Sequence, residues 1–330
     1  MQTMKGYIYA LAAFLGFSLA QVGPLLPQVE PPPPRPDWIR PGLVVLYSDG
    51  IGQTTLFFLV TEVTATEAYG ASFRLAQSDA GPMLTVTIGP LYLGGSGPFY
   101  LAPQAVAQAG RRAPPGTQIQ TQPGWIGILR RTPNGESKYA VRYDPESGMV
   151  LETSGSYRAP AGAGPRQGAA FHLQLAGTES VPWTPVAGFP PAARAPAAYQ
   201  VYYVLTSGAQ TPGGEFQVEP LEVGAQLARY RVQARQNGVL TPPSEQLGVP
   251  ALGPHYLHPA LLRRDPILQV PALNFEIRTA GPGPSGGQVV VMQLGGMPLR
   301  AIEVDPGSGA VLLYQEPVPG IGTTVYRRVR

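Results

Sequence analysis

Two stretches of the sequence share one pattern of glycine, proline and aromatic residues: Gly97-Pro98-Phe99-Tyr100-Leu101-Ala102-Pro103 and Gly253-Pro254-His255-Tyr256-Leu257-His258-Pro259. They begin 156 residues apart. Each is followed by a second shared element, Asp144-Pro145-Glu146-Ser147-Gly148 and Asp305-Pro306-Gly307-Ser308-Gly309, at an offset of 161 residues. Two ordered matches at nearly one offset are typical of an internal duplication.

Further matches at the first offset extend the repeat towards the N-terminus. Tyr47 aligns with Tyr203, and Ser72-Phe73-Arg74-Leu75 aligns with Ala228-Arg229-Tyr230-Arg231. We therefore predict two tandem, diverged copies of one β domain, and we place them at residues 38–182 and 183–330.

The Asp-Pro-x-x-Gly elements predict β-hairpins. Aspartate caps the turn amides, proline presets φ for a type I turn, and glycine supplies the left-handed residue of the return. Before the first turn, Lys138–Tyr143 alternates apolar and polar residues as a half-buried strand does, and Met149–Thr153 returns. In the second copy Glu303 takes the place of Arg142 on the polar side of the hairpin, so we predict that Glu303 faces solvent.

Short apolar runs separated by glycine- and proline-rich turns predict an all-β fold. Each copy is expected to form an antiparallel β-sandwich or a strongly curved sheet, and the sequence leaves both open. One short helix is expected in each copy, at Pro103–Ala109 and at Pro259–Arg264. The expected strands are 43–47, 56–63, 72–77, 84–88, 117–121, 125–130, 138–143, 149–153, 171–175, 199–205, 215–221, 228–234, 274–278, 288–294 and 323–329.

Composition excludes several classes of protein. The chain of 330 residues has 44% apolar residues, enough for a core, and a formal net charge of +3 with arginines in dispersed doublets. That balance does not provide the clustered positive charge of a nucleic-acid-binding protein. Because there is no cysteine, disulfides, zinc–thiolate sites, thiol catalysis and a cysteine-linked lipid anchor are excluded.

The N-terminus has the pattern of a secretory signal peptide at residues 1–20. Lys5 supplies the basic region, Tyr7–Leu19 is apolar, and Ser18-Leu19-Ala20 is a small-x-small cleavage site before Gln21. Residues 21–37 form a proline-rich linker that favours a stiff, extended spacer. We therefore expect an exported protein, periplasmic or extracellular, without a transmembrane segment in the mature chain.

The candidate ligand-binding residues are Tyr100, Tyr256, His255 and His258, all within the repeated elements. Tyrosine suits the lining of a groove because one end of its side chain is apolar and the other polar, although packing of half-buried strands gives the same composition. The two histidines could ligate a metal, but Phe99 and Ala102 occupy their places in the first copy, so we expect no metal and no cofactor.

Two patterns of the sequence suggest catalytic residues, and each has a structural requirement. Gly283-Pro284-Ser285-Gly286-Gly287 fits G-x-S-x-G, but a strand rather than a helix follows it, so we expect a hairpin loop and no nucleophile. Strand carboxylates could form a glycosidase pair only if the fold brings them together. The candidates are Glu62, Glu67, Glu276 and Glu303.

These observations favour a non-enzymatic binding protein or a structural component of the cell envelope. Its expected partner is a hydrophobic ligand or an envelope protein, and the oligomeric state is left open. In outline, export, the all-β pattern and the recurring Asp-Pro hairpin are similar to periplasmic carriers that hold lipid or lipoprotein chains on a curved sheet. The alternative is an exported hydrolase that acts on glycans or peptides through paired carboxylates.

Overall fold

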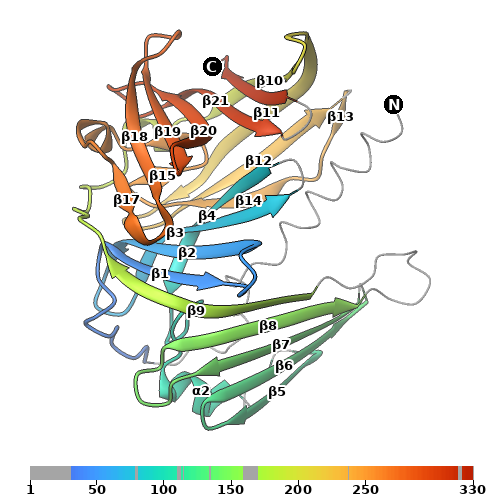
Figure 1. Ribbon diagram of the computed structural model, residues 1–330, viewed down its shortest axis with the longest axis vertical. Helices are drawn as coiled ribbons and strands as arrows, with labels where there is room; N and C mark the ends of the chain where they lie inside the picture. The colour runs from blue at the N-terminus through green and yellow to red at the C-terminus, as the bar shows by residue number, and fades with distance from the viewer. Residues whose placement is uncertain are drawn as a thin grey trace. The chain divides into compact units, whose positions relative to one another are not determined.

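The computed structural model describes residues 31–78, 81–109, 113, 115–133, 135–158, 170–236, 238–318 and 322–329 (Figure 1). Antiparallel strands account for most of these residues, and the described part of the chain contains one α-helix. The predicted all-β class is therefore confirmed. The predicted signal peptide and residues 21–30 of the predicted linker lie outside the described residues.

The chain forms two compact units, which are described separately. Of the described residues, unit 1 comprises those within 31–35, Ala65–Glu67 and Leu91–Leu175, and unit 2 comprises those within Pro36–Thr64, Ala68–Pro90 and 176–329. These units group residues by their contacts, whereas the predicted boundary at residue 183 follows the repeat in the sequence. The two tandem domains therefore stay a prediction.

Unit 1 is built on a meander sheet with one short helix, α2 (Pro103–Ala109), where a helix was predicted. Consecutive strands pair in the order β9-β8-β7-β6-β5, so every connection between neighbours is a hairpin. One face of the sheet is buried, and its residues include Ile126, Ile128 and Val141. The strands are β5 (Thr117–Gln122), β6 (Trp125–Thr132), β7 (Gly135–Tyr143), β8 (Val150–Arg158) and β9 (Ala170–Ser180), which continues from Leu175 into unit 2.

Unit 2 contains a smaller and a larger sheet. The smaller sheet has the order β4-β3-β2-β1 and then the second half of β9, with β1 (Leu43–Ser48), β2 (Thr54–Val63), β3 (Ala68–Ser78) and β4 (Gly81–Tyr92). The larger sheet has the order β13-β12-β11-β10-β22-β21-β20-β19-β18-β17, and β14 also pairs with β12. The order β12-β11-β10-β22-β21-β20-β19-β18 corresponds strand for strand to β3-β2-β1-β9-β8-β7-β6-β5. This correspondence is what two copies of one domain would give.

The strands of the larger sheet are β10 (Ala197–Leu205), β11 (Gln210–Val223), β12 (Ala228–Gln236), β13 (Val239–Leu240), β14 (Ser244–Gly248), β17 (Leu268–Val270), β18 (Phe275–Pro282), β19 (Gln288–Leu294), β20 (Met297–Val304), β21 (Val311–Val318) and β22 (Gly322–Arg328). A separate two-stranded ladder and three 3₁₀ helices complete unit 2: β15 (Leu252–Gly253), β16 (Tyr256–Leu257), η3 (Pro191–Arg194), η4 (Pro259–Arg263) and η5 (Pro271–Leu273).

The helix predicted at Pro259–Arg264 is the 3₁₀ helix η4 and not an α-helix. The side chain of His258 accepts a hydrogen bond from the Ala260 amide, and Leu261 donates to the His258 carbonyl three residues back. Arg264 is already extended, so only five residues are helical, a length at which 3₁₀ geometry is common. The helices η3 and η5 were not predicted.

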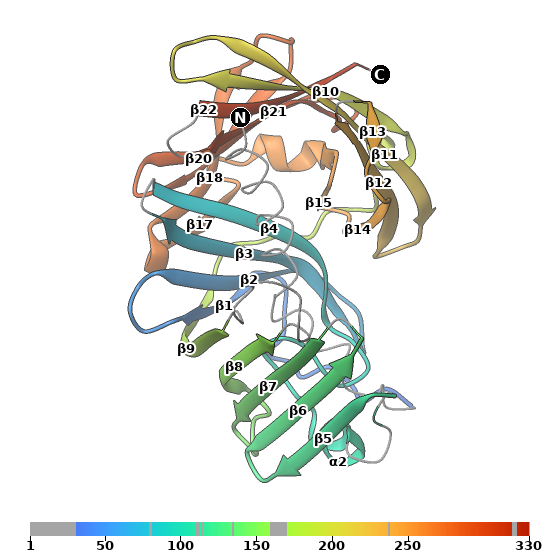
Figure 2. The same ribbon diagram turned by 90° about the vertical axis from the view of Figure 1, so that its right-hand side faces the viewer.

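One apolar core fills unit 2 between its two sheets. Figure 2 shows the larger sheet curving around the light-orange segment that carries η4, whose Leu261 and Leu262 are buried in the core. The Phe57 and Phe73 rings of the smaller sheet stack with centroids 4.6 Å apart, and Phe275 of β18 lies 5.1 Å from Phe57. The alternatives of a β-sandwich and a strongly curved sheet were predicted for each copy by itself, whereas unit 2 includes strands of both predicted copies, so both alternatives stay predictions.

The two repeated elements contact each other in the same way in each copy. In unit 1, the Leu101 amide donates to the Gly148 carbonyl (2.9 Å) and the Val150 amide donates to the Phe99 carbonyl (3.0 Å). The matching bonds in unit 2 join Leu257 to Gly309 (2.9 Å) and Val311 to His255 (3.0 Å). The Gly-Pro-x-Tyr-Leu element thus packs on the Asp-Pro hairpin, which explains why both elements recur together.

The strand registers correct part of the predicted alignment. Tyr47 pairs with Leu56, and the equivalent pair is Tyr199 with Phe216, so Tyr47 corresponds to Tyr199 and not to Tyr203. Likewise Ala228 corresponds to Ala68 and not to Ser72, because β-bulges at Val60/Glu62 and Pro220/Glu222 precede equivalent turns. The offset between equivalent residues differs from strand to strand, so a single offset does not align the two regions throughout.

Candidate functional site

The two predicted tyrosines lie in the packing of the repeated elements. Tyr100 is 8% exposed, and its ring centroid is 5.5 Å from that of Tyr92. Tyr256 is 1% exposed, and its hydroxyl donates to the Val249 carbonyl at 2.9 Å. Burial raises the pKa of both phenols. Ligand binding at Tyr100 and Tyr256 stays a prediction.

The two predicted histidines also have structural contacts. His255 is fully buried, with its Nε2 2.9 Å from the Ala192 carbonyl and its ring 4.9 Å from that of Tyr230. Burial lowers the pKa of His255 to about 4. His258 Nδ1 accepts from the Ala260 amide at 3.1 Å. Within the described ranges no cluster of three metal-ligating side chains occurs, and ligand binding by either histidine stays a prediction.

Glu303 does not face solvent as predicted, since only 1% of it is exposed. The loop Gly283–Gly287 folds over it, and its Oε1 accepts from the amides of Ser285 (2.7 Å) and Gly287 (2.8 Å). An ideal Cβ at Gly283 would lie 2.4 Å from the Glu303 carboxyl carbon, so this approach requires a glycine. The G-x-S-x-G stretch is therefore a hairpin loop, as predicted, and it binds a carboxylate through its backbone.

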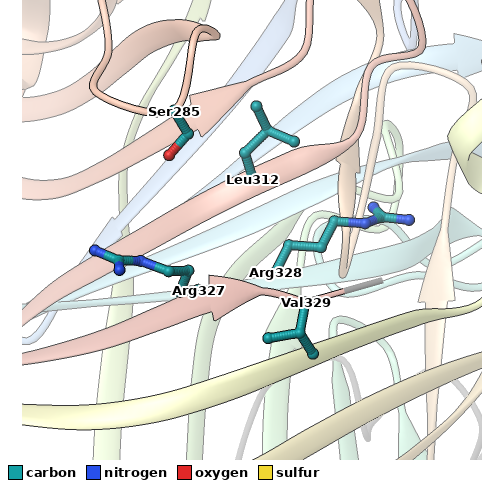
Figure 3. A pocket seen from close by; sticks show the side chains of 5 residues that line it. All are labelled: Ser285, Leu312, Arg327, Arg328 and Val329. Carbon is teal, nitrogen blue, oxygen red and sulfur yellow. The ribbon is translucent and has the colours of Figure 1, made fainter.

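A hollow of about 380 Å³ lies beside this loop, lined by Ser285, Leu312, Arg327, Arg328 and Val329 (Figure 3). Figure 3 shows the guanidinium groups of Arg327 and Arg328 pointing in opposite directions, as neighbouring residues of a strand do. The two cations therefore do not converge on one point in the hollow.

Glu62 is a buried carboxylate of β2 whose contacts stabilise the fold. Burial raises the pKa of Glu62 to about 7, while a hydrogen bond from the Val186 amide and the positive charge of Arg264 oppose that shift. Trp183 Nε1 donates to the Thr61 carbonyl at 3.2 Å. Glu62 and its neighbour Thr61 thus hold the segment Trp183–Val186 against β2.

The exposed side of the unit 1 sheet has a different character. We call it the open face and define it by two rows of directly paired residues, whose side chains project from the same side of the sheet. The first row is Gln122, Trp125, Arg142, Glu152 and Gln174, and the second is Gln120, Gly127, Ala140, Ser154 and His172. Figure 1 shows the strands β5 to β8 that carry these rows lying side by side.

Trp125 lies along its own strand on the open face. An ideal Cβ at Gly127 would be 2.3 Å from the Cη2 atom of the Trp125 indole, so the benzo ring occupies the space above Gly127. Trp125 is partly exposed, although a tryptophan of this size buries readily in a core. The indole therefore offers an apolar surface among polar neighbours.

A chain of polar contacts that includes one ion pair crosses three strands beside Trp125, and we call it the ionic chain. Arg142 Nε donates to Glu152 Oε2 at 3.0 Å, and His172 Nε2 lies 2.8 Å from Glu152 Oε1. These contacts, with that of His172 the largest, hold the pKa of Glu152 below its usual range. The Arg142 side chain is 58% exposed and that of His172 is 50% exposed, so both remain accessible while their partner holds them in place.

Sequence reasoning missed the open face, although part of its signal was present. The alternation in Lys138–Tyr143 identified Arg142 as a polar-side residue of the hairpin. Trp125 and His172 were interpreted only as strand residues, because nothing in the sequence places β6 and β9 on either side of β7 and β8. The carboxylate Glu152 was not among the candidates.

No protein-family model and no curated protein matches this sequence. Among solved structures, the chain is similar to a crystal structure from Nostoc punctiforme of a protein of unknown function from the DUF3598 family, with 10% identity and a TM-score of 0.17. That match covers 90% of this chain and 99% of the other. None of the helices in the described residues is long and apolar enough to cross a membrane.

Proposed function

We propose that this chain is an exported, non-enzymatic binding protein of the cell envelope that captures its ligand on the open face of unit 1. The observation that carries the proposal is the exposed row around Trp125, Arg142 and Glu152, where an aromatic ring lies beside fixed, accessible polar groups. Export is supported by the predicted signal peptide, with its cleavage site before Gln21.

Binding at a surface, not in an interior cavity, agrees with the packing of unit 2. The concave side of the larger sheet, where a carrier would hold an apolar chain, is filled by Phe57, Phe73 and Phe275 together with η4. A ligand in that position would have to displace these rings and expose apolar surface to water. The proposal therefore replaces the hydrophobic cargo with a surface ligand.

Fractionation of cells that produce the full chain tests the proposal. We expect the mature protein to begin at Gln21 and to sediment with washed, insoluble envelope material. A variant with both Trp125→Ala and Arg142→Gln should stay in the supernatant, whereas Arg231→Gln should sediment like the wild type, because Arg231 is an equally exposed arginine of unit 2.

Two results would overturn the proposal. One is a wild-type chain that keeps residues 1–20 and remains inside the cell. The other is an apolar ligand that co-purifies with the exported protein in native mass spectrometry and is released on mild denaturation. That result would favour a carrier of a hydrophobic ligand instead.

A further inference from the structure

The charges on the open face are unevenly distributed. Glu136, Arg131 and Lys138 continue the open face along β6 and β7, and we include them in it from here on. Glu136 contacts Arg131 at 3.0 Å and Lys138 at 3.4 Å. Glu152 contacts Arg142 and the imidazole of His172, which is charged only when protonated. Arg131, Lys138 and Arg142 therefore outnumber the two carboxylates, even without a charge on His172. Because every anion already has its partners, an incoming carboxylate meets guanidinium and ammonium donors.

The uncharged part of the face is rich in amides and hydroxyls. Gln118, Gln120 and Gln122 follow one another along the outer side of β5, and all three are exposed. An amide side chain both donates and accepts hydrogen bonds, which is what the hydroxyl groups of a sugar require. Ser154 adds a hydroxyl in the second row, next to Ala140.

The shape of the second row suits an extended polymer. Gly127, Ala140 and Ser154 are short, and they stand between longer side chains of the neighbouring rows. A chain that crosses the strands along this row would contact Trp125 over Gly127 and then the ionic chain at Glu152. The C–H face of a sugar ring is apolar and packs on an indole, whose ring carries a negative face.

We propose that the open face binds an acidic glycan, a polysaccharide that carries carboxylate groups, with Trp125 against a sugar ring and Arg142 on a carboxylate. This inference rests on the proposed function, because it names the ligand of the same site. A nucleic acid fits less well, because the arginines of this chain occur in dispersed doublets and do not form the clustered positive charge that a phosphate backbone requires. A protein partner fits less well, because charged residues are depleted at the centres of protein interfaces.

Affinity electrophoresis of the purified mature protein in gels that contain polygalacturonate tests the inference, with dextran as the neutral control. Polygalacturonate should retard the wild type and dextran should not. Trp125→Ala and Arg142→Gln should each weaken binding about tenfold, as central contacts of an interface do. Trp125→Phe should recover part of the loss, and Arg231→Gln should bind like the wild type.

Salt supplies a second readout that a purely structural role would not change. Binding of the wild type should weaken as ionic strength rises, because exposed charges are screened. In Arg142→Gln the dependence on salt should be shallower. Thermal unfolding of each variant verifies that it is folded, since both substituted side chains are partly or largely exposed.

The outcomes separate this inference from the function on which it rests. If polygalacturonate does not retard the wild type but envelope material still binds it through Trp125 and Arg142, the acidic glycan is wrong and the proposed function holds. If neither the gel nor the envelope material distinguishes the wild type from the two variants, both are wrong. Equal retardation by dextran would also show that the proposal of an acidic glycan is wrong.

Discussion

The open face of unit 1 and the equivalent face of unit 2 lie on strands that pair in the same order, but the side chains at equivalent positions differ in charge and exposure. In unit 1 the directly paired residues Arg142 and Glu152 form an exposed ion pair. In unit 2 the equivalent pair is Glu303 and Leu313, which are 1% and 7% exposed. The outer sides of the two hairpins therefore differ, while the Asp-Pro turns that close them are alike.

The length of one hairpin loop explains the difference. In unit 1, Gln122 pairs with Trp125, so β5 and β6 are joined by the two-residue turn Pro123-Gly124. In unit 2, Pro282 pairs with Gln288, and the five residues between them fold over Glu303. A short turn leaves the face open to a ligand, and a longer loop covers it with backbone amides that need an acceptor.

The second row of the open face also differs from its equivalent in unit 2. Where unit 1 has Gly127, Ser154 and His172 in its second row, the equivalent residues of unit 2 are Val291, Gln315 and Val325. Ser154 and Gln315 are both polar, whereas His172 is replaced by the apolar Val325, so an imidazole at this place is not a requirement of the strand pairing.

The largest expected effect is the loss of stability in Glu303→Ala. The substitution leaves the amide of Gly287, which is buried, and that of Ser285 without the carboxylate that accepts from both, which should lower the free energy of unfolding by about 3–4 kcal/mol. Urea denaturation measures this, with Glu303→Gln as a milder variant that keeps one acceptor oxygen. Losses of similar size in Glu303→Ala and Arg142→Ala would contradict the comparison.

A second prediction uses His255, which stands where the first copy has Phe99. The pKa of His255 is lowered to about 4, and that of an unfolded histidine is about 6.5, so the unfolded chain binds the proton first as the pH falls. Stability is fully present above about pH 6.5 and should fall by about 3 kcal/mol on going to pH 4.

The test compares urea denaturation of the wild type and His255→Phe across this pH range. The variant should be less stable at pH 7, because the Ala192 carbonyl loses its partner, but its stability should change less between pH 6.5 and 4. A variant with the same pH dependence as the wild type would show that His255 is not the group responsible.

Gly148 and Gly309 test what the two copies have in common. Their φ angles are 74° and 79°, and an ideal Cβ would lie 2.6 Å from the carbonyl oxygen of Leu101 or Leu257, respectively. Gly148→Ala and Gly309→Ala should therefore each lower the free energy of unfolding by about 2 kcal/mol. Gly286 is the control: its φ is 85°, but an ideal Cβ there would meet no atom within 4 Å. Gly286→Ala therefore tests backbone strain without a steric clash, and it should lower the free energy of unfolding by about 1 kcal/mol.

Sequence reasoning predicted the features that depend on local pattern. The alternation in Lys138–Tyr143, the Asp-Pro turns and the short helix at Pro103–Ala109 are all present, because period, turn chemistry and helix propensity act over a few residues. The all-β class followed from the same local signals, repeated along the chain.

The prediction was wrong where a distant segment decides the environment. The hairpin pattern around Glu303 is that of an exposed position, and only the loop at residues 283–287 makes it a buried one. The open face depends in the same way on a sheet order that joins β6, β8 and β9 through β7. The alternation of apolar and polar residues in one strand predicts neither the length of a loop that covers it nor the spatial order of the strands around it.

The smallest expected effect on stability is the most informative for function. Replacing Glu152 by the residue of the second copy, Glu152→Leu, removes an exposed ion pair and should change the free energy of unfolding by less than about 1 kcal/mol. The reverse change, Leu313→Glu, buries a carboxylate in unit 2 and should be far more costly. In the polygalacturonate gel, Glu152→Leu should nevertheless weaken retardation, because Arg142 and His172 lose the carboxylate that orients them. If binding were unchanged while stability fell, the ionic chain would serve the fold of unit 1 and the contrast between the two faces would carry no functional meaning.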